Sequence, residues 1–219
     1  MPRKPKARLL LADDHKLLAE ACKGMLEPEY EVVDVLTDGR ALVQAAIIHK
    51  PDVIILDIGM PHLNGLDAGE QIKKKLHSVK LVFLTMNASA EVAAEAFRRG
   101  AAAYVLKQSA ADELLTALRN VVKGDSYLSP LIARETVSYL LRQGKGLAAQ
   151  PQITKRQSEI LQLLAEGMSM KEVANMLELK PGTVAFHKYR MMETLGFKTN
   201  AELLEYAIKR NMSPSKPEI

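Results

Sequence analysis

The sequence predicts an α/β domain with a mostly parallel sheet, followed by a smaller all-α domain. Two observations predict the first domain: five short apolar, β-branched runs recur along the first half, and a stretch of helical periodicity follows each of them. A third observation predicts the second domain, because strand-like runs then stop and only segments with helical periodicity remain.

The five predicted strands are nearly continuous apolar runs, as expected for strands covered by helices on both faces. They lie at Arg8–Ala12, Glu31–Leu36, Val53–Asp57, Lys80–Thr85 and Ala103–Leu106. The intervening helices are expected at Lys16–Leu26, Arg40–His49, Leu66–Leu76, Ala90–Arg99 and Ala111–Val122. Gly100, which follows two arginines, is typical of a helix end.

The periodicity changes near Gly124, and we place the domain boundaries accordingly. Residues 1–124 form the first domain, residues 125–150 a linker with a helix over 130–142, and residues 151–219 the second domain. The second domain should contain four helices, at Thr154–Glu166, Met170–Leu177, Gly182–Leu195 and Asn200–Arg210. Thr154 and Gln157 have the spacing of a capping box, and Asn200 is the expected cap of the last helix.

The bulk composition is that of a globular protein with two cores. A chain of 219 residues with 47% hydrophobic residues suits two domains. The single cysteine, Cys22, excludes an internal disulfide framework and is expected to be a small buried residue. The apolar runs are too short to span a bilayer, and the basic start at Met1–Arg8 does not lead into a signal-peptide core. We therefore expect a cytoplasmic protein with no membrane partner, and its net charge of +4 requires any nucleic-acid binding to use a local basic face.

Three carboxylates stand where predicted strands end. Asp13 and Asp14 follow the first strand, and Asp57 ends the third. Ligands bind beyond the carboxyl ends of the strands in open α/β sheets, so neighbouring strands would bring these acids together. Oxygen ligands of this kind suit Mg²⁺, which would offset their mutual repulsion.

Two more strand ends supply a hydroxyl and an ammonium group. Thr85 ends the fourth strand and Lys107 follows the fifth. Each residue alone has an ordinary interpretation, because an aspartate at a strand end is usually a turn or helix cap and such a lysine is usually solvated. Together they predict a phosphoryl-accepting site in which Asp57 is the nucleophile, Lys107 neutralises charge and Thr85 donates a hydrogen bond.

Residues 8–124 resemble the receiver domain of bacterial two-component response regulators. The resemblance rests on the Asp13-Asp14 pair, the segment from Leu56 to Pro61 with Gly65, Thr85, and Tyr104 with Lys107. It implies a flavodoxin-like, five-stranded (β/α)5 fold. It further implies that Asp57 is the phosphoacceptor, that Asp13, Asp14, Asp57 and the backbone carbonyl of Gly59 hold Mg²⁺, and that Thr85 and Tyr104 form a switch pair.

Residues 153–210 resemble the helix-turn-helix of the LuxR/NarL type of response regulator. The shared segments include Ile153–Gln157, Leu161–Gly167, Ser169–Ala174 and Thr183-Val184 with His187. Three positions depart from the usual pattern: Gln157 replaces a commoner Glu, Met170 a common Asn, and Ala185 a frequent Lys or Arg. The last departure removes the expected basic side chain from the groove-facing position.

The third helix of this domain is the expected DNA-reading helix. Val184, His187, Met191 and Leu195 have the spacing of a core-facing stripe, so His187 is expected to be a packed residue and not a ligand. The opposite face offers base contacts, and the flanking polar residues offer phosphate contacts. The predicted DNA-binding residues are Thr183, Ala185, Phe186, Lys188, Tyr189 and Arg190.

The sequence thus favours a transcription factor switched by phosphorylation and not an enzyme with an external substrate. The resemblance implies a sensor histidine kinase as donor, double-stranded DNA as partner, release of the recognition helix, and a homodimer formed partly through Asn200–Arg210. Leu203, Leu204, Ala207 and Ile208 would supply an apolar stripe for that dimer.

Three alternatives remain open at this stage. A phosphatase or dehalogenase would use Asp57 as nucleophile, but such enzymes usually need a second acid where this chain has Gly59. The second domain could instead bind a protein, and the regulator could act without phosphorylation.

Overall fold

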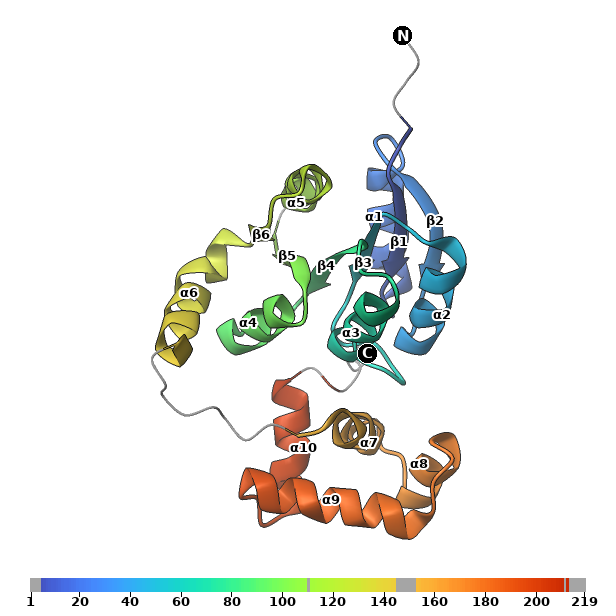
Figure 1. Cartoon of the computed structure of the whole chain (residues 1–219), viewed down its shortest axis with the longest axis vertical. Helices are drawn as coiled ribbons and strands as arrows, with labels where there is room; N and C mark the ends of the chain where they lie inside the picture. The colour runs from blue at the N-terminus through green and yellow to red at the C-terminus, as the bar shows by residue number, and fades with distance from the viewer. Residues whose placement is uncertain (1–4, 110, 145–152, 211, 213–219) are drawn as a thin grey trace.

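The first domain is built on one parallel sheet with strand order β2-β1-β3-β4-β5-β6 (Figure 1). The computed structural model describes residues 5–109, 111–144, 153–210 and 212. The strands are β1 (Arg8–Ala12), β2 (Glu31–Leu36), β3 (Val53–Leu56), β4 (Lys80–Thr85), β5 (Ala101–Leu106) and β6 (Tyr127–Leu128). All five pairings between neighbouring strands are parallel, as the sequence predicted for the first five strands.

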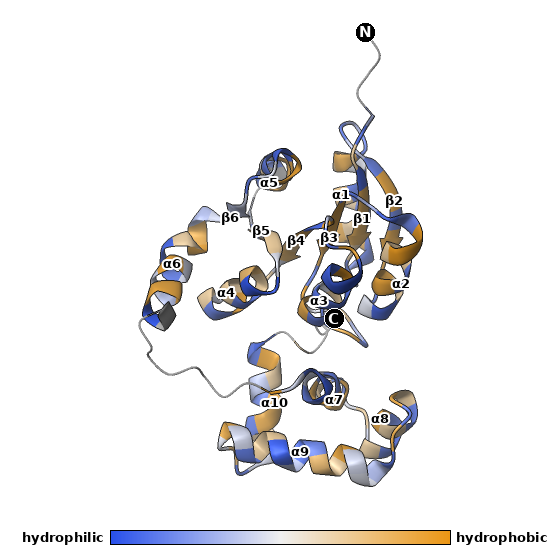
Figure 2. Cartoon of the chain, viewed as in Figure 1, coloured by the Kyte–Doolittle hydropathy of each residue, from blue (hydrophilic) through white to orange (hydrophobic). Residues whose placement is uncertain are grey.

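Helices cover both faces of this sheet. They are α1 (Lys16–Leu26), α2 (Gly39–His49), α3 (Gly65–Lys75), α4 (Ala90–Arg98), α5 (Ala111–Lys123) and α6 (Pro130–Gly144). Successive strand residues serve opposite faces: Leu9 packs in a cluster with α1 and α5, whereas Leu10 packs in a cluster with α2, α3 and α4. The central strands are therefore apolar along their length, as their colour in Figure 2 shows. Cys22 is buried in the first of these clusters, as predicted.

The sixth strand was not predicted. Tyr127 and Leu128 pair with β5, and the Ser129 hydroxyl accepts a hydrogen bond from the Leu106 amide at 3.0 Å. Ile132 of α6 is buried in the same core cluster as residues of α2, α3 and α4. The segment from β6 into α6 therefore packs against the first domain. A two-residue strand has no periodicity to detect, so only the pairing with β5 shows it.

The second domain is helical, as predicted. Its helices are α7 (Lys155–Ala165), α8 (Met170–Met176), α9 (Pro181–Leu195) and α10 (Asn200–Lys209). The predicted capping box of Thr154 and Gln157 is present at the start of α7. The expected cap of α10 was wrong by one residue, because Thr199 caps the helix through a reciprocal pair with Glu202. The predicted linker segment Gly146–Pro151 and the start of the chain at Met1–Lys4 lie outside the described residues.

The two domains lie against each other. Helix α7 sits beside α3, and the C-terminal end of α10 approaches α4 (Figure 1). Hydrogen bonds join the domains at both places, from Ser158 to Asp67 and from Arg210 to Glu91. Within the described part of the chain, none of the helices is long and apolar enough to cross a membrane.

Candidate functional site: an acidic pocket and a DNA-reading helix

Strand register brings the predicted acids together. Ala12 of β1 is the partner of Leu56 in β3, so the next residues of the two strands, Asp13 and Asp57, emerge side by side. The Asp57 amide donates to the Ala12 carbonyl at 2.9 Å and fixes this alignment. Oxygens of Asp13, Asp14 and Asp57 and a ring nitrogen of His15 all lie within 4.8 Å of one another. His15 was not among the predicted site residues.

Lys107 neutralises the two most buried acids. Its Nζ lies 2.8 Å from Asp13 Oδ2 and 2.6 Å from Asp57 Oδ2, and all three side chains are nearly inaccessible to solvent. Burial lowers the pKa of Lys107, but the charges of Asp57 and Asp13 outweigh this effect and raise the pKa above its usual value. The side chain is therefore a fixed ammonium at the bottom of the pocket.

The pocket fits a divalent cation. Burial raises the pKa of Asp14, and the nearby charges of Asp57 and Asp13 raise it further, against the lowering effect of His15. Asp14 Oδ1 is buried and accepts no hydrogen bond from a described residue, although His15 Nδ1 lies 2.8 Å away. Three carboxylates gathered this closely suit a hard cation such as Mg²⁺.

Thr85 and Tyr104, the predicted switch pair, lie on the neighbouring strands β4 and β5. Thr85 of β4 is the partner of Leu106 in β5, and the Lys107 amide donates to the Thr85 carbonyl at 2.9 Å. Tyr104 is fully buried, and its hydroxyl donates to the Asn87 carbonyl at 2.6 Å. Burial raises the pKa of Tyr104, so the phenol keeps its proton. The ring is thus turned inward in this structure.

Asn87 is a residue that the sequence did not single out. Its amide donates to Thr85 Oγ1 at 3.2 Å and its carbonyl accepts from Tyr104, so it joins the two predicted switch residues. Its side-chain amide also lies 3.4 Å from the Lys209 carbonyl at the end of α10. Its position two residues after Thr85 was the only available signal in the sequence.

The predicted DNA-reading face of α9 is open to solvent. Phe186 and Tyr189 are 60% and 62% exposed, whereas Val184 and Met191 are fully buried in the domain core. His187 is half-buried, with its ring 5.7 Å from that of Phe186. In the docked arrangement Phe186 and Tyr189 therefore remain accessible to solvent.

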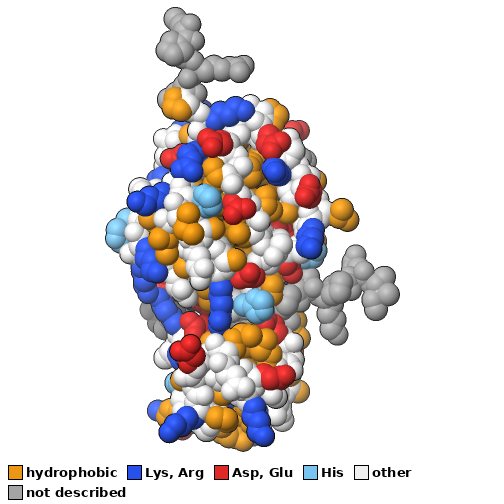
Figure 3. Space-filling view, turned by 90° about the vertical axis from the view of Figure 1, so that its right-hand side faces the viewer, with side chains coloured by type: hydrophobic (Ala, Val, Ile, Leu, Met, Phe, Trp, Pro, Cys, Tyr) orange, Lys and Arg blue, Asp and Glu red, His pale blue; other side chains and the backbone are white. Residues whose placement is uncertain are grey.

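The polar residues of α9 flank this aromatic face. Lys188 Nζ lies 5.8 Å from the centre of the Tyr189 ring, and Arg190 pairs with Glu193 at the surface. Thr183 and Ala185 are half-buried on the N-terminal half of the helix. Figure 3 shows basic, acidic and apolar side chains interspersed on one face of the molecule, which agrees with the modest net charge.

The expected apolar stripe of α10 is only partly available for a dimer. Leu203 and Ala207 are buried in the core of their own domain. Leu204 and Ile208 are 38% and 62% exposed and remain accessible. The sequence could not separate these two pairs, because all four residues share one side of the helix.

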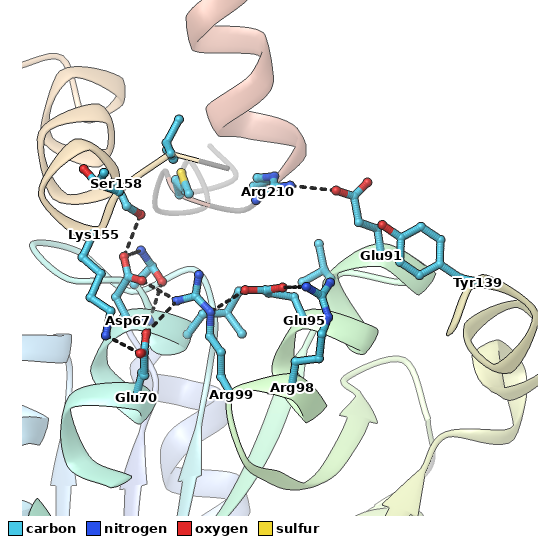
Figure 4. Close-up of a pocket in the computed structure, with 16 residues that line it drawn as sticks. Asp67, Glu70, Glu91, Glu95, Arg98, Arg99, Tyr139, Lys155, Ser158 and Arg210 are labelled. Atoms are coloured by element: carbon cyan, nitrogen blue, oxygen red, sulfur yellow. Dashed lines mark hydrogen bonds and ion pairs between the residues drawn. The ribbon is translucent and has the colours of Figure 1, made fainter. Parts of the chain in front are cut away.

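A buried polar network joins the domains at α3 and α7 (Figure 4). Asp67 accepts hydrogen bonds from Arg99 at 2.5 Å, from Ser158 at 2.7 Å and from the Asn64 side chain at 2.8 Å. Lys155 of α7 pairs with Glu70 of α3 beside this network. This network could not be predicted from the sequence, because polar residues spaced along α7 look like an ordinary solvated helix face.

Comparisons with known proteins agree with both parts of this description. The family model "Response regulator receiver domain" matches residues 9–119, and the model "Bacterial regulatory proteins, luxR family" matches residues 151–207. The oxygen regulatory protein NreC of Staphylococcus carnosus is 33% identical over 213 residues, which are 94% of this chain and 98% of NreC. The transcriptional regulatory protein MctR of Rhizobium johnstonii is 32% identical, over 95% of this chain and 96% of MctR.

A solved structure supports the same assignment. The response regulator RcsB of Salmonella typhimurium matches with a TM-score of 0.65 and 28% identity, over 94% of this chain and 99% of RcsB. The chain therefore belongs to the response regulators that join a receiver domain to a luxR-family domain, and it is a DNA-binding regulator of transcription and not a conventional enzyme.

Proposed function

We propose that a sensor histidine kinase phosphorylates Asp57 and that phosphorylation controls dimerisation and sequence-specific DNA binding. The observation that carries this proposal is the convergence of Asp13, Asp14, Asp57 and Lys107 in one pocket, with Asp57 only 4% exposed. A structural cluster of caps or surface charges would not need three carboxylates and an ammonium at the same edge of a sheet.

The phosphoryl transfer uses groups that are already in place. An Asp57 carboxylate oxygen forms a new P–O bond while the P–N bond of the donor phosphohistidine breaks. The electron pair of that bond stays with the imidazole of the donor, which takes up a proton. Lys107, 2.6 Å from Asp57, would neutralise the transferring oxygens, and Thr85 would donate to one of them.

Asp13, Asp14, Asp57 and the Gly59 carbonyl would hold Mg²⁺, which screens the charge between the carboxylates and the incoming phosphoryl group. The closeness of the three carboxylates, whose oxygens lie within 4.8 Å of one another, supports this assignment. Thr85 and Tyr104 would then report the phosphoryl group to the β4–α4 segment through Asn87, which hydrogen-bonds both.

The DNA contacts would come from α9. Ala185, Phe186 and Tyr189 would meet base edges in the major groove, with Thr183, Lys188 and Arg190 on phosphates. The exposure of Phe186 and Tyr189 supports this face, because large rings rarely stay in solvent without a partner. Solved structures of RcsB show that protein bound to DNA, in one case as two dimers and in another with a phosphomimetic, which supports DNA-bound dimers here.

We further propose that the active form is a homodimer in the cytoplasm, where the kinase domain and DNA are both available. Leu204 and Ile208 of α10 are the accessible apolar residues on which the DNA-binding domains could pair.

Acetyl phosphate and Mg²⁺ test the site. Wild-type protein should gain one phosphoryl group that base and hydroxylamine remove, as expected for an acyl phosphate, and should bind DNA more tightly, and Asp57→Asn should do neither. Equal phosphorylation of Asp57→Asn and wild type would refute the assignment. Steady hydrolysis of a small phosphate ester would instead favour the enzyme alternative.

A further inference from the structure

We propose that Gln162, a residue of the DNA-binding domain, is a positioning residue for the metal-binding loop of the receiver. The loop consists of residues 58–64 between β3 and α3. The inference rests on the proposed function, because it concerns how the Gly59 carbonyl of this loop would be held for Mg²⁺.

Gln162 is buried and fully hydrogen-bonded between the domains. Its Nε2 donates to the Met60 carbonyl at 2.9 Å and to Glu166 at 2.9 Å. Its Oε1 accepts from the Asn64 backbone amide at 2.7 Å and from the Asn64 side chain at 3.2 Å. The amide therefore uses both donors and both acceptor positions, with 0% of the residue exposed.

These contacts add to the hydrogen bonds by which the receiver itself holds the loop. The receiver holds the two ends, through Asp57 bonded to Ala12 and Gly65 bonded to the Ile58 carbonyl at 2.9 Å, and the middle, through the Pro61 carbonyl, which accepts from the Leu63 amide at 2.7 Å and the Gly39 amide at 3.4 Å. The hydrogen bonds of Gln162 fall on either side of Pro61, at Met60 and Asn64. The peptide units that carry the Gly59 and Met60 carbonyls meet at the Cα of Met60. Pro61 follows and restricts the backbone of Met60, so holding the Met60 carbonyl limits the orientations open to the Gly59 carbonyl.

Further contacts between the domains surround Gln162 on α7. The His62 amide donates to Glu166 at 3.0 Å, which adds a third hold on the same loop. Ser158 bonds to Asp67 and Lys155 pairs with Glu70, and both of these contacts lie on α3 and not on the loop. The interface thus contains contacts that dock the domains and separate contacts that shape the loop.

The hydrogen bonds of Gln162 would couple domain docking to metal binding, so that each favours the other. A loop held in place loses less conformational freedom when its carbonyl takes a metal, so the docked protein should bind the cation more tightly. Reciprocity then requires that the cation favour docking by the same factor. This is compatible with DNA binding, because Phe186 and Tyr189 are exposed in the docked arrangement.

Direct binding of Mn²⁺, used in place of Mg²⁺, tests the proposal without phosphorylation. Free Mn²⁺ is followed by electron paramagnetic resonance during titration of the full chain. Gln162→Ala should raise the Kd for Mn²⁺ about fivefold, the usual effect of one neutral hydrogen-bonded group. Gln162→Met, which keeps the length of the side chain and removes both polar atoms, should give the same change if the alanine variant folds poorly.

Lys155→Ala is the matched control, because it removes an interdomain contact on the same helix without touching the loop. The pair is half-exposed and adds less than about 1 kcal/mol to docking, so the domains should stay docked in this variant. Its Kd should stay within twofold of wild type. An unchanged Kd in both Gln162 variants, or an equal rise in Lys155→Ala, would overturn the proposal.

The proposed function fails separately if wild type binds no Mn²⁺ or is not phosphorylated. If wild type does both and the Gln162 variants behave like it, only the positioning role is lost.

Discussion

Gly65, the first residue of α3, lies so close to the backbone of Asp57, just after β3, that no side chain fits there. A Cβ at this position would lie 2.0 Å from the Asp57 carbonyl oxygen and 3.0 Å from the Ile58 Cα. Carbon and oxygen normally approach to about 3.3 Å, so Gly65→Ala forces α3 and the Asp57 segment apart by roughly 1.3 Å. Both neighbours are backbone, and no rotamer change can relieve the contact.

We expect Gly65→Ala to destabilise the receiver by about 3 kcal/mol, at the upper end of the cost of overpacking because backbone must move. That corresponds to roughly a hundredfold faster hydrogen exchange of the amides that exchange only through global unfolding. Exchange of peptides from β1 and β3 is the suitable measurement, because the two domains need not unfold together.

Gly24→Ala is the matched control in the same domain. Gly24 lies within α1, and an added Cβ would meet nothing within 4 Å. Alanine is favoured over glycine in a helix by about 0.7 kcal/mol, so exchange should slow about threefold. Unchanged exchange in Gly65→Ala, with the expected slowing in Gly24→Ala, would refute the close approach of α3 to Asp57.

Three further changes test the pocket and the DNA-reading helix. Tyr104→Phe leaves the buried Asn87 carbonyl without its hydrogen-bond donor, so the free energy of unfolding should fall by about 1.5 kcal/mol in urea denaturation. An unchanged free energy of unfolding would contradict this hydrogen bond. Lys107→Ala leaves Asp57 beside Asp13 without the ammonium group between them, so the free energy of unfolding should fall by about 3 kcal/mol without Mg²⁺ and by less with it. Thermal melts measure this difference, and an equal loss of stability with and without the ion would contradict a shared cation site. Lys188→Ala should reduce the slope of log affinity for DNA against log salt concentration by about one. Tyr189→Ala should weaken DNA binding without changing that slope. If the double variant binds DNA with the affinity and the slope of the wild type, these contacts are wrong.

Local signals in the sequence were enough to place the pocket. Each pocket group follows an apolar strand, and parallel strands bring their carboxyl ends to one edge of the sheet, so Asp13, Asp57, Thr85 and Lys107 could be assigned before the structure was known. Lys107 lies within hydrogen-bond distance of Asp13 and Asp57 because of the strand register, which cannot be read from the sequence residue by residue.

Features that depend on contacts between distant segments could not be predicted. Gln162 and Met60 are 102 residues apart, and a glutamine on an amphipathic helix has the same local pattern whether it faces water or a second domain. The same reason explains α10, where only packing separates buried Leu203 from exposed Leu204.

The sequence by itself therefore determined the two domains and the chemical groups of the pocket, because these depend on periodicity and on residue type at strand ends. The tertiary structure alone decided that the DNA-binding domain holds the loop beside Asp57 through Gln162 while its recognition helix stays exposed. Docking depends on the shapes and hydrogen-bonding groups of two folded surfaces, which exist only after both domains have formed.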